Sequence, residues 1–189
     1  MSTALRPGMS GPNVAALQQR LAELGYFVPR TDGDYDETTV HAVTAFQKVN
    51  GLDRDGIAGP ETVRALDTAT RPEARDPSRR SIEIDLTRQV LLVVDEGAVR
   101  LVLDVSTGTG SRTPTGRYRV EREIDGYHRS ELGVLYRPKY VVGGVAVHGF
   151  PSVPPFPASH GCIRTINPAM DWLWEHDAMP IGTPVWIYR

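Results

Sequence analysis

The chain has 189 residues, enough for one or two small domains with their own hydrophobic cores. Its formal net charge of −2 lacks the basic excess that neutralises phosphates, which argues against a nucleic-acid-binding protein. No apolar run approaches the roughly 20 residues needed to span a membrane, and a single cysteine forms no intramolecular disulfide. Residues 1–8 lack the apolar core of a signal peptide, so we expect no signal peptide in this sequence.

Residues 1–70 predict a bundle of three short helices. Ser10 is the predicted N-cap of the first helix and Gly25 its stop. The second helix is expected from about Asp36 to Gly51, and the third begins at Gly59. The first helix carries an apolar stripe at helical spacing, made of Val14, Leu17, Leu21 and Leu24.

Residues 1–70 contain a short internal sequence repeat. Asp32-Gly33 precedes Thr39-Val40 at the offset at which Asp55-Gly56 precedes Thr62-Val63. Two similar turn-and-helix units are the simplest explanation. His41 lies mid-helix with no cysteine or carboxylate at metal-ligand spacing, so we expect a surface or half-buried histidine without a chemical role.

Residues 71–80 separate this bundle from the rest of the chain. The segment is rich in charge and proline and has one alanine as its apolar content. Such a composition buries too little surface to offset its ordering entropy. We therefore predict an exposed, semi-stiff linker in which the arginines form a solvated charge run.

Residues 81–189 predict a second, mostly-β domain of the sandwich type. Apolar residues alternate from Ile82 to Leu86 and from Val99 to Val105, and 90–94 is a continuous apolar run. Residues 106–116 form a long polar loop, and the simplest interpretation of it is a flexible hairpin connection without a functional role. One helix is expected at Asn167-Pro168 and a closing strand at 185–188. The predicted fold class is thus multidomain: a helical bundle, then a β-sandwich-like domain with one or two short helices.

The stretch from His148 to Arg164 has the composition of a reactive site. It holds the only cysteine, Cys162, and two of the five histidines, His148 and His160. A free thiol is only a few per cent thiolate near neutral pH, so a nucleophilic cysteine needs a base. His148 follows an apolar strand directly and is expected at the strand end. Taken alone, the residues indicate a Cys–His acyl-transfer site; an inert buried thiol and a core histidine are the alternatives.

The order His148-Gly149, a spacer, and Ser159-His160-Gly161-Cys162-Ile163-Arg164 resembles the L,D-transpeptidase (YkuD-type) catalytic domain. Segments 106–108, 113–116 and 182–185 extend this resemblance over the whole second domain. Residues 5–66 similarly resemble the peptidoglycan-binding domain 1 family, which implies a three-helix module for cell-wall glycopeptide. Gln18, Gln47 and the Asp-Gly loops favour this module over a generic bundle, because core packing alone does not require them.

The resemblance implies a catalytic role for three residues. Cys162 is the nucleophile that attacks a stem-peptide amide, and His148 is the preferred base. His160 lies two residues from Cys162 and remains the competing base, or a residue that supports the loop. Because no carboxylate is adjacent, a backbone carbonyl near Gly149 is expected to orient the imidazole.

The remaining site residues are assigned to binding and support. Backbone N–H groups of Gly161 and Cys162 are the predicted oxyanion donors. Arg164 either binds a substrate carboxylate or braces the loop, and the two readings are left open. Ser159 is expected to bond the local backbone. Zinc on His148, His160 and Cys162 is a weaker alternative because no HExxH or CxxC pattern supports it, so no cofactor or metal is predicted.

The resemblance therefore implies a cell-wall enzyme that releases D-alanine and forms 3–3 cross-links through an acyl-enzyme on Cys162. The alternatives are an L,D-carboxypeptidase, in which water resolves the acyl-enzyme, and a catalytically idle wall-binding protein. Peptidoglycan is the expected partner, and the sequence does not indicate an oligomeric state. A location in the cell wall, periplasm or extracellular face follows from the resemblance alone.

Overall fold

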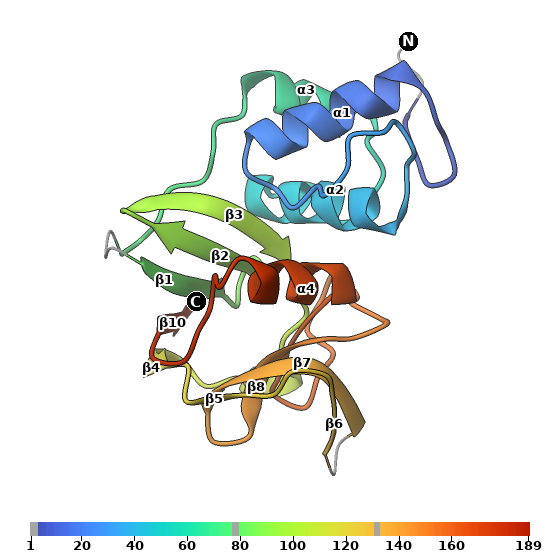
Figure 1. The fold of residues 1–189 in the computed structure, drawn as a ribbon. Coiled ribbons are helices and arrows are strands. Elements are labelled where there is room, and N and C mark those ends of the chain that lie inside the picture. The colour runs from blue at the N-terminus through green and yellow to red at the C-terminus, as the bar shows by residue number, and fades with distance from the viewer. Residues whose placement is uncertain (1–3, 77–79, 131–132) are drawn as a thin grey trace.

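The structure, a computed structural model, describes residues 4–76, 80–130 and 133–189 and has a helical part followed by a β part (Figure 1). The helices are α1 (Pro12–Glu23), α2 (Glu37–Asn50), α3 (Pro60–Thr68), η1 (Thr109–Ser111) and α4 (Asn167–Glu175). The strands are β1 (Arg80–Asp85), β2 (Val90–Asp95), β3 (Ala98–Asp104), β4 (Gly116–Arg119), β5 (Arg122–Glu123), β6 (Tyr127–Ser130), β7 (Gly133–Val142), β8 (Val145–Gly149), β9 (Ile163–Thr165) and β10 (Pro184–Tyr188). The predicted fold class, a helical bundle before a β-sandwich-like domain, is confirmed.

The internal sequence repeat in the helical part, in which an Asp-Gly turn precedes a Thr-Val pair twice, has a structural cause. Gln18 in α1 accepts from the N–H of Gly33 at 2.9 Å and donates to the hydroxyl of Thr39 at 2.9 Å. Gln47 in α2 repeats this arrangement with Gly56 at 2.9 Å and with the hydroxyl of Thr62 at 3.2 Å. Both glutamines are buried.

The sequence favoured a binding module because core packing alone did not explain Gln18 and Gln47. These contacts show that this reason was wrong. Gln18 and Gln47 clamp turns inside the bundle, so they serve the fold. A buried amide with its donors and acceptor satisfied is a stabilising group and is not free to bind a ligand.

The helix ends agree with the sequence except at two caps, since the predicted N-cap Asn167 is the first residue of α4 and Ile166 precedes it as the N-cap. Asp36 caps α2 by accepting from the N–H of Thr39 at 2.9 Å, and Gly51 ends that helix with a left-handed backbone. The prediction of Ser10 as N-cap of α1 is wrong, because Gly11 occupies that position without a side-chain cap. Ser10 instead forms a β-bridge with Asp34.

The β part is built from two sheets within the described residues. The first has the strand order β3-β2-β1-β10-β4, with β1 and β10 parallel. The second has the order β5-β7-β8-β9, with β6 paired to β7. The inner faces of both sheets and helix α4 enclose one apolar cluster, which includes Ile84, Leu91, Val147, Ile163 and Met170.

Strand β2 is buried on both faces. Leu91 and Val93 point into the sandwich, whereas Val90, Leu92 and Val94 pack with the helical bundle. Figure 1 shows the bundle, with α2 nearest, stacked on the sheet that contains β2 and β3. Two-sided burial explains why residues 90–94 form an unbroken apolar run without alternation.

The described part of the predicted linker contacts both parts of the molecule. Arg71 donates from Nη2 to the Glu23 carbonyl at 2.8 Å and from Nη1 to the Val99 carbonyl at 3.2 Å. Arg75 lies over the ring of Tyr188 at 4.1 Å. Residues 71–76 are exposed or half-buried, and residues 77–79 of the predicted linker lie outside the described residues.

Candidate active site

His148 lies near the end of β8, as the sequence predicts, and its side chain is buried with a relative exposure of 2 %. Its Nδ1 is 2.9 Å from the carbonyl oxygen of Gly149. A carbonyl can only accept, so the proton sits on Nδ1 and Nε2 keeps its lone pair. Burial lowers the pKa of His148 to about 4, with a smaller contribution from Arg164 and opposition from the Gly149 bond. His148 is therefore a neutral imidazole near pH 7.

Cys162 lies directly before β9, the strand that runs parallel to β8. His148 pairs with Arg164 in the neighbouring strand. Cys162 lies two positions before Arg164, so it is the diagonal neighbour of His148 on the same sheet face. The Cys162 thiol is half-buried and donates to the Gly144 carbonyl at 3.7 Å. Burial, the largest cause, raises the pKa of this thiol. The structure thus brings a neutral thiol and a neutral imidazole to one face.

Ser159 shapes the loop that carries the thiol. Its hydroxyl donates to the Cys162 carbonyl at 2.6 Å and accepts from the Gly161 N–H at 3.0 Å. Gly161 has φ +144°, a backbone conformation that favours glycine. This is the local backbone role expected of Ser159. Because the Gly161 N–H is engaged within the loop, the Cys162 N–H is the predicted oxyanion donor that remains.

The polar loop of residues 106–116 braces the cysteine loop from its other side. Thr107 accepts through its carbonyl from the N–H groups of Ala158 at 2.9 Å and Ser159 at 3.0 Å. Thr113 donates its hydroxyl to the Gly161 carbonyl at 2.7 Å. Residues 106–116 are therefore held in place by hydrogen bonds and do not form the merely flexible connection that was the alternative interpretation of this segment. The sequence indicated only that parts of this segment resemble the catalytic domain, and it did not identify Thr107 and Thr113 as the bracing residues.

Arg164 and His160 have different environments. The Arg164 guanidinium lies over the Phe150 ring at 4.3 Å, and its Nη1 donates to the Ala158 carbonyl at 3.4 Å. These contacts brace the loop, while binding of a substrate carboxylate by Arg164 stays a prediction. His160 is exposed, in contrast to the buried His148.

Comparison with known proteins places this site in a family. The model of the L,D-transpeptidase catalytic domain matches residues 79–187, more than half of the chain. The chain belongs to the L,D-transpeptidase catalytic domain family. A putative peptidoglycan binding domain matches residues 10–66, in agreement with the resemblance of the helical part.

Solved structures support both the family and the relative arrangement of its parts. An L,D-transpeptidase structure from Xylanimonas cellulosilytica DSM 15894 is 47 % identical with a TM-score of 0.95, over 100 % of this chain and 98 % of that one. An L,D-transpeptidase from Stackebrandtia nassauensis covers the same shares at 24 % identity and a TM-score of 0.58, which shows a shared fold.

Curated relatives match only a part of the chain. A probable N-acetylmuramoyl-L-alanine amidase of Bacillus licheniformis is 48 % identical over 67 residues, which are 34 % of this chain. The chain spans only 19 % of that protein's length.

Two further properties of this L,D-transpeptidase family member concern metals and membranes. Within residues 4–76, 80–130 and 133–189, no three His, Cys, Asp or Glu side chains group closely enough to hold a metal ion. His148, His160 and Cys162 thus provide no such group for the zinc alternative. The helices in the described residues also lack the length and apolarity needed to cross a bilayer.

Proposed function

We propose that this protein is a peptidoglycan L,D-transpeptidase in which Cys162 carries the acyl group. The observation that carries the proposal is a buried His148 with its Nδ1 proton held by Gly149, on the same sheet face as Cys162. The family match over residues 79–187 supplies the substrate class. The peptidoglycan of the cell wall is the proposed location and partner.

The acylation step starts from the neutral pair. Nε2 of His148 takes the Cys162 proton as Sγ bonds to the carbonyl carbon of the amide between the third and fourth stem residues. The oxyanion forms beside the Cys162 N–H, as in other preorganised acyl-transfer sites. The C–N bond then breaks, and the imidazolium returns the proton to the departing D-alanine amine. A thioester on Cys162 and free D-alanine result.

Resolution of the thioester determines the product. The amine of a second stem adds to the thioester carbonyl, His148 receives the amine proton, and the C–S bond breaks. The departing thiolate then recovers the proton, which leaves a 3–3 cross-link and a free thiol. Attack by water gives a tripeptide instead, and that is the L,D-carboxypeptidase alternative.

Product analysis tests this proposal. The full chain, and separately Cys162→Ala, is incubated with purified disaccharide-tetrapeptide, and the products are weighed by mass spectrometry. A dimer whose mass is two substrates less one D-alanine, absent with Cys162→Ala, is the expected result. A tripeptide monomer alone indicates the carboxypeptidase. Unchanged substrate with an intact, reactive thiol shows that the substrate assignment is wrong.

We also propose that the helical module holds peptidoglycan in the groove between α1 and α3. The groove has a volume of about 660 Å³, in the range of small-molecule sites, and its lining includes Leu5, Met9, Ala16, Leu17 and Arg20. The family match over residues 10–66 supports this occupant. The lining also includes the polar residues Asn13 and Asp67, and apolar walls with a few polar groups suit the carbon faces and the amide groups of a glycopeptide.

Two charge-matched variants on α1 test the groove. Ala16 is exposed and lines the groove, whereas Gln19 is exposed on the same helix. Ala16→Glu should weaken co-sedimentation of the full chain with purified sacculi, and Gln19→Glu should leave it at the parental level. Equal retention of both variants would place wall binding elsewhere.

A further inference from the structure

A buried lysine joins the two parts of the molecule. Lys48 in α2 has a side chain with 0 % exposure and donates from Nζ to Asp104 Oδ1 at 2.5 Å. The same ammonium donates to the carbonyls of Val105 at 2.8 Å and Gln89 at 3.1 Å. A buried ammonium is costly unless it is paired and hydrogen-bonded, and here each of its donors has an acceptor.

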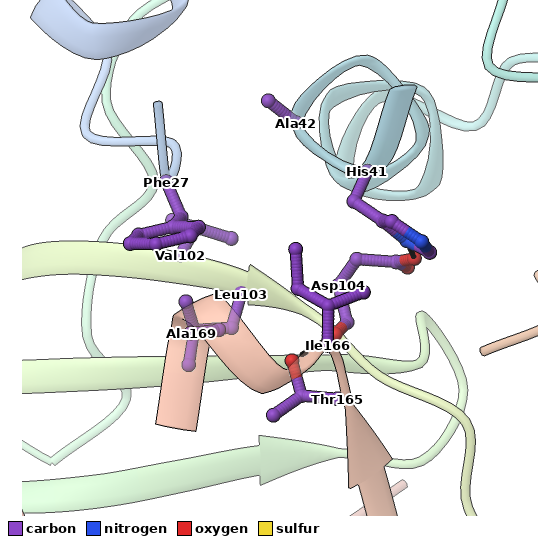
Figure 2. Close-up of a pocket in the computed structure, with 9 residues that line it drawn as sticks. All are labelled: Phe27, His41, Ala42, Val102, Leu103, Asp104, Thr165, Ile166 and Ala169. Carbon is purple, nitrogen blue, oxygen red and sulfur yellow. Dashed lines mark hydrogen bonds and ion pairs between the residues drawn. The ribbon is translucent and has the colours of Figure 1, made fainter. Parts of the chain in front are cut away.

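Asp104, at the end of β3, is shared by two residues of α2. Its Oδ2 lies 2.6 Å from Nδ1 of His41, and its Oδ1 accepts from Lys48. Figure 2 shows His41 reaching from its helix toward Asp104, with Thr165 on the other side. The Thr165 hydroxyl donates to the Asp104 carbonyl at 2.9 Å, and Thr165 ends β9, the strand that follows Cys162.

A second path leads from Lys48 to the cysteine loop through Gln89. The Gln89 side chain donates to the Thr107 hydroxyl at 2.7 Å and accepts from the Thr107 N–H at 2.8 Å. Thr107 in turn accepts from the N–H groups of Ala158 and Ser159. Ser159 then holds the Cys162 carbonyl. Each link is a hydrogen bond between buried or half-buried groups.

We propose that Lys48 is a positioning residue for Cys162, so that helix α2 of the peptidoglycan-binding module completes the support of the catalytic loop. This rests on the proposed acyl transfer at Cys162. Removal of the ammonium leaves the Asp104 carboxylate with His41 alone and takes a donor from the carbonyls of Gln89 and Val105. Gln89, between β1 and β2, and the end of β3 then lose one of the groups that hold them against the cysteine loop, while the backbone bonds between Ser106 and Arg164 remain. The module therefore belongs to the catalytic unit as well as to the wall contact.

The main test compares Lys48→Met with a control contact at the opposite end of β3. Methionine is similar in length to lysine but has no donor. Arg71→Met removes the bond to the Val99 carbonyl, which also joins the two parts but does not lead to Thr107. The probe is imipenem, whose β-lactam carbonyl acylates a reactive thiol, and intact mass measures acylation of the folded full chain.

The expected result is a maximal acylation rate lowered about tenfold or more by Lys48→Met, as for a misplaced nucleophile, and unchanged by Arg71→Met. The concentration of imipenem at half-maximal rate should change little, because the loop is displaced while the pocket remains. A Lys48→Met protein that is folded and acylates at the parental rate would overturn the proposal. Equal slowing by Arg71→Met would also overturn it, because the effect would then be general loosening.

Hydrogen exchange gives a readout that does not need activity. The amides of Ala158 and Ser159 should exchange faster in Lys48→Met and at the parental rate in Arg71→Met. If the parental protein is not acylated, the proposed function fails, and exchange still decides the role of Lys48. Unchanged exchange in Lys48→Met contradicts that role.

A second variant covers the case in which Lys48→Met does not fold. Gln89 has φ +62°, a conformation that asparagine adopts readily. Gln89→Asn therefore keeps the backbone but shortens the side chain, so that it no longer reaches Thr107. Slower acylation and faster exchange at Ala158 and Ser159 are expected with Lys48 intact. Parental values in both measurements would overturn the path.

Discussion

His148 and Cys162 are both neutral in the resting site, for the same physical reason. Burial disfavours the charged form of each group, so it lowers the pKa of the imidazole and raises that of the thiol. The site therefore does not store a thiolate–imidazolium pair. The thiol is expected to lose its proton during attack, which makes the position of Nε2 decisive.

Replacement of each histidine separates the two candidate bases. His148→Gln should lower the rate of Cys162 acylation by roughly 10²–10⁴-fold, because positioned proton transfer contributes about that much. His160→Gln should have a much smaller effect, because His160 is exposed. Pre-steady-state acylation by imipenem measures both. A larger loss for His160→Gln than for His148→Gln would reverse the assignment.

The lowered pKa of His148 also predicts a pH dependence of stability. The folded protein holds this group at a pKa of about 4 against 6.5 for the model group, so the unfolded chain binds the proton first as pH falls. The contribution of His148 to the free energy of unfolding is fully present above pH 6.5 and is lost as the pH falls toward 4. The total loss over this range is about 3 kcal/mol.

Urea unfolding at a series of pH values checks this expectation. The free energy of unfolding of the parental protein, minus that of His148→Gln, should fall as pH decreases from 6.5 to 4. Subtraction removes the contributions of the other titrating groups that the two proteins share. A difference independent of pH would mean that His148 has no lowered pKa in the folded state.

At the scale of elements, two loops and the ends of two strands form the site together. Segment 106–116 follows β3 and lies against the cysteine loop, where Gly108 closely approaches Gly161. A Cβ on Gly108 would lie 2.8 Å from the Cα of Gly161 and 2.9 Å from the N of Thr113. Gly108 has φ −66°, so close approach, and not conformational freedom, requires glycine at this position.

Thr113 provides a matched test of this bracing. Thr113→Val keeps the shape but removes the donor to the Gly161 carbonyl and the acceptor for the Gly108 N–H, whereas Thr113→Ser keeps the hydroxyl. We expect Thr113→Val to lower the free energy of unfolding by about 1–3 kcal/mol and to slow acylation, since buried polar groups lose their partners. Thr113→Ser should lie closer to the parental protein in both. Equal losses for the two variants would mean that the hydroxyl bonds contribute no more than the methyl group does at this position.

At the scale of the molecule, the helical module covers a face that the β part cannot leave exposed. Val90, Leu92, Val94, Val99 and Val102 are buried in the cluster shared with the bundle. Full burial of one such side chain stabilises by about 1.5–3 kcal/mol. The sum over this face is comparable to the whole stability of a small domain, about 5–15 kcal/mol. The two parts are therefore expected to fold as one cooperative unit.

Truncation tests this coupling. The fragment of residues 80–189 should lack a cooperative thermal transition or bind a hydrophobic dye, while the full chain unfolds in a single calorimetric transition. Independent folding is the contrary outcome: a fragment with its own sharp transition close to that of the full chain. That result would mean that the helical module does not stabilise the β part and is only tethered to it.

Local features were predictable because their causes lie close in sequence. The helical stripes, the caps at Asp36 and Gly51 and the strand that ends in His148 follow from periodicity and turn chemistry over a few residues. Ser10 misled because a serine before a helix is a frequent cap, while here Gly11 begins the helix and Ser10 bridges to Asp34. The clamping role of Gln18 and Gln47 was missed because an amide partner cannot be identified from spacing alone.

The sequence by itself determined the family and the order of the two parts, and its motif predicts Cys162 and His148 as the reactive residues, since a short motif and hydrophobic periodicity carry that information. Only the tertiary structure decided which surfaces meet. Lys48 and Asp104 are 56 residues apart, and neither stands out in its own segment. Their pairing depends on how the bundle packs on β2 and β3, and burial then makes it strong, because an ammonium and a carboxylate removed from water need each other.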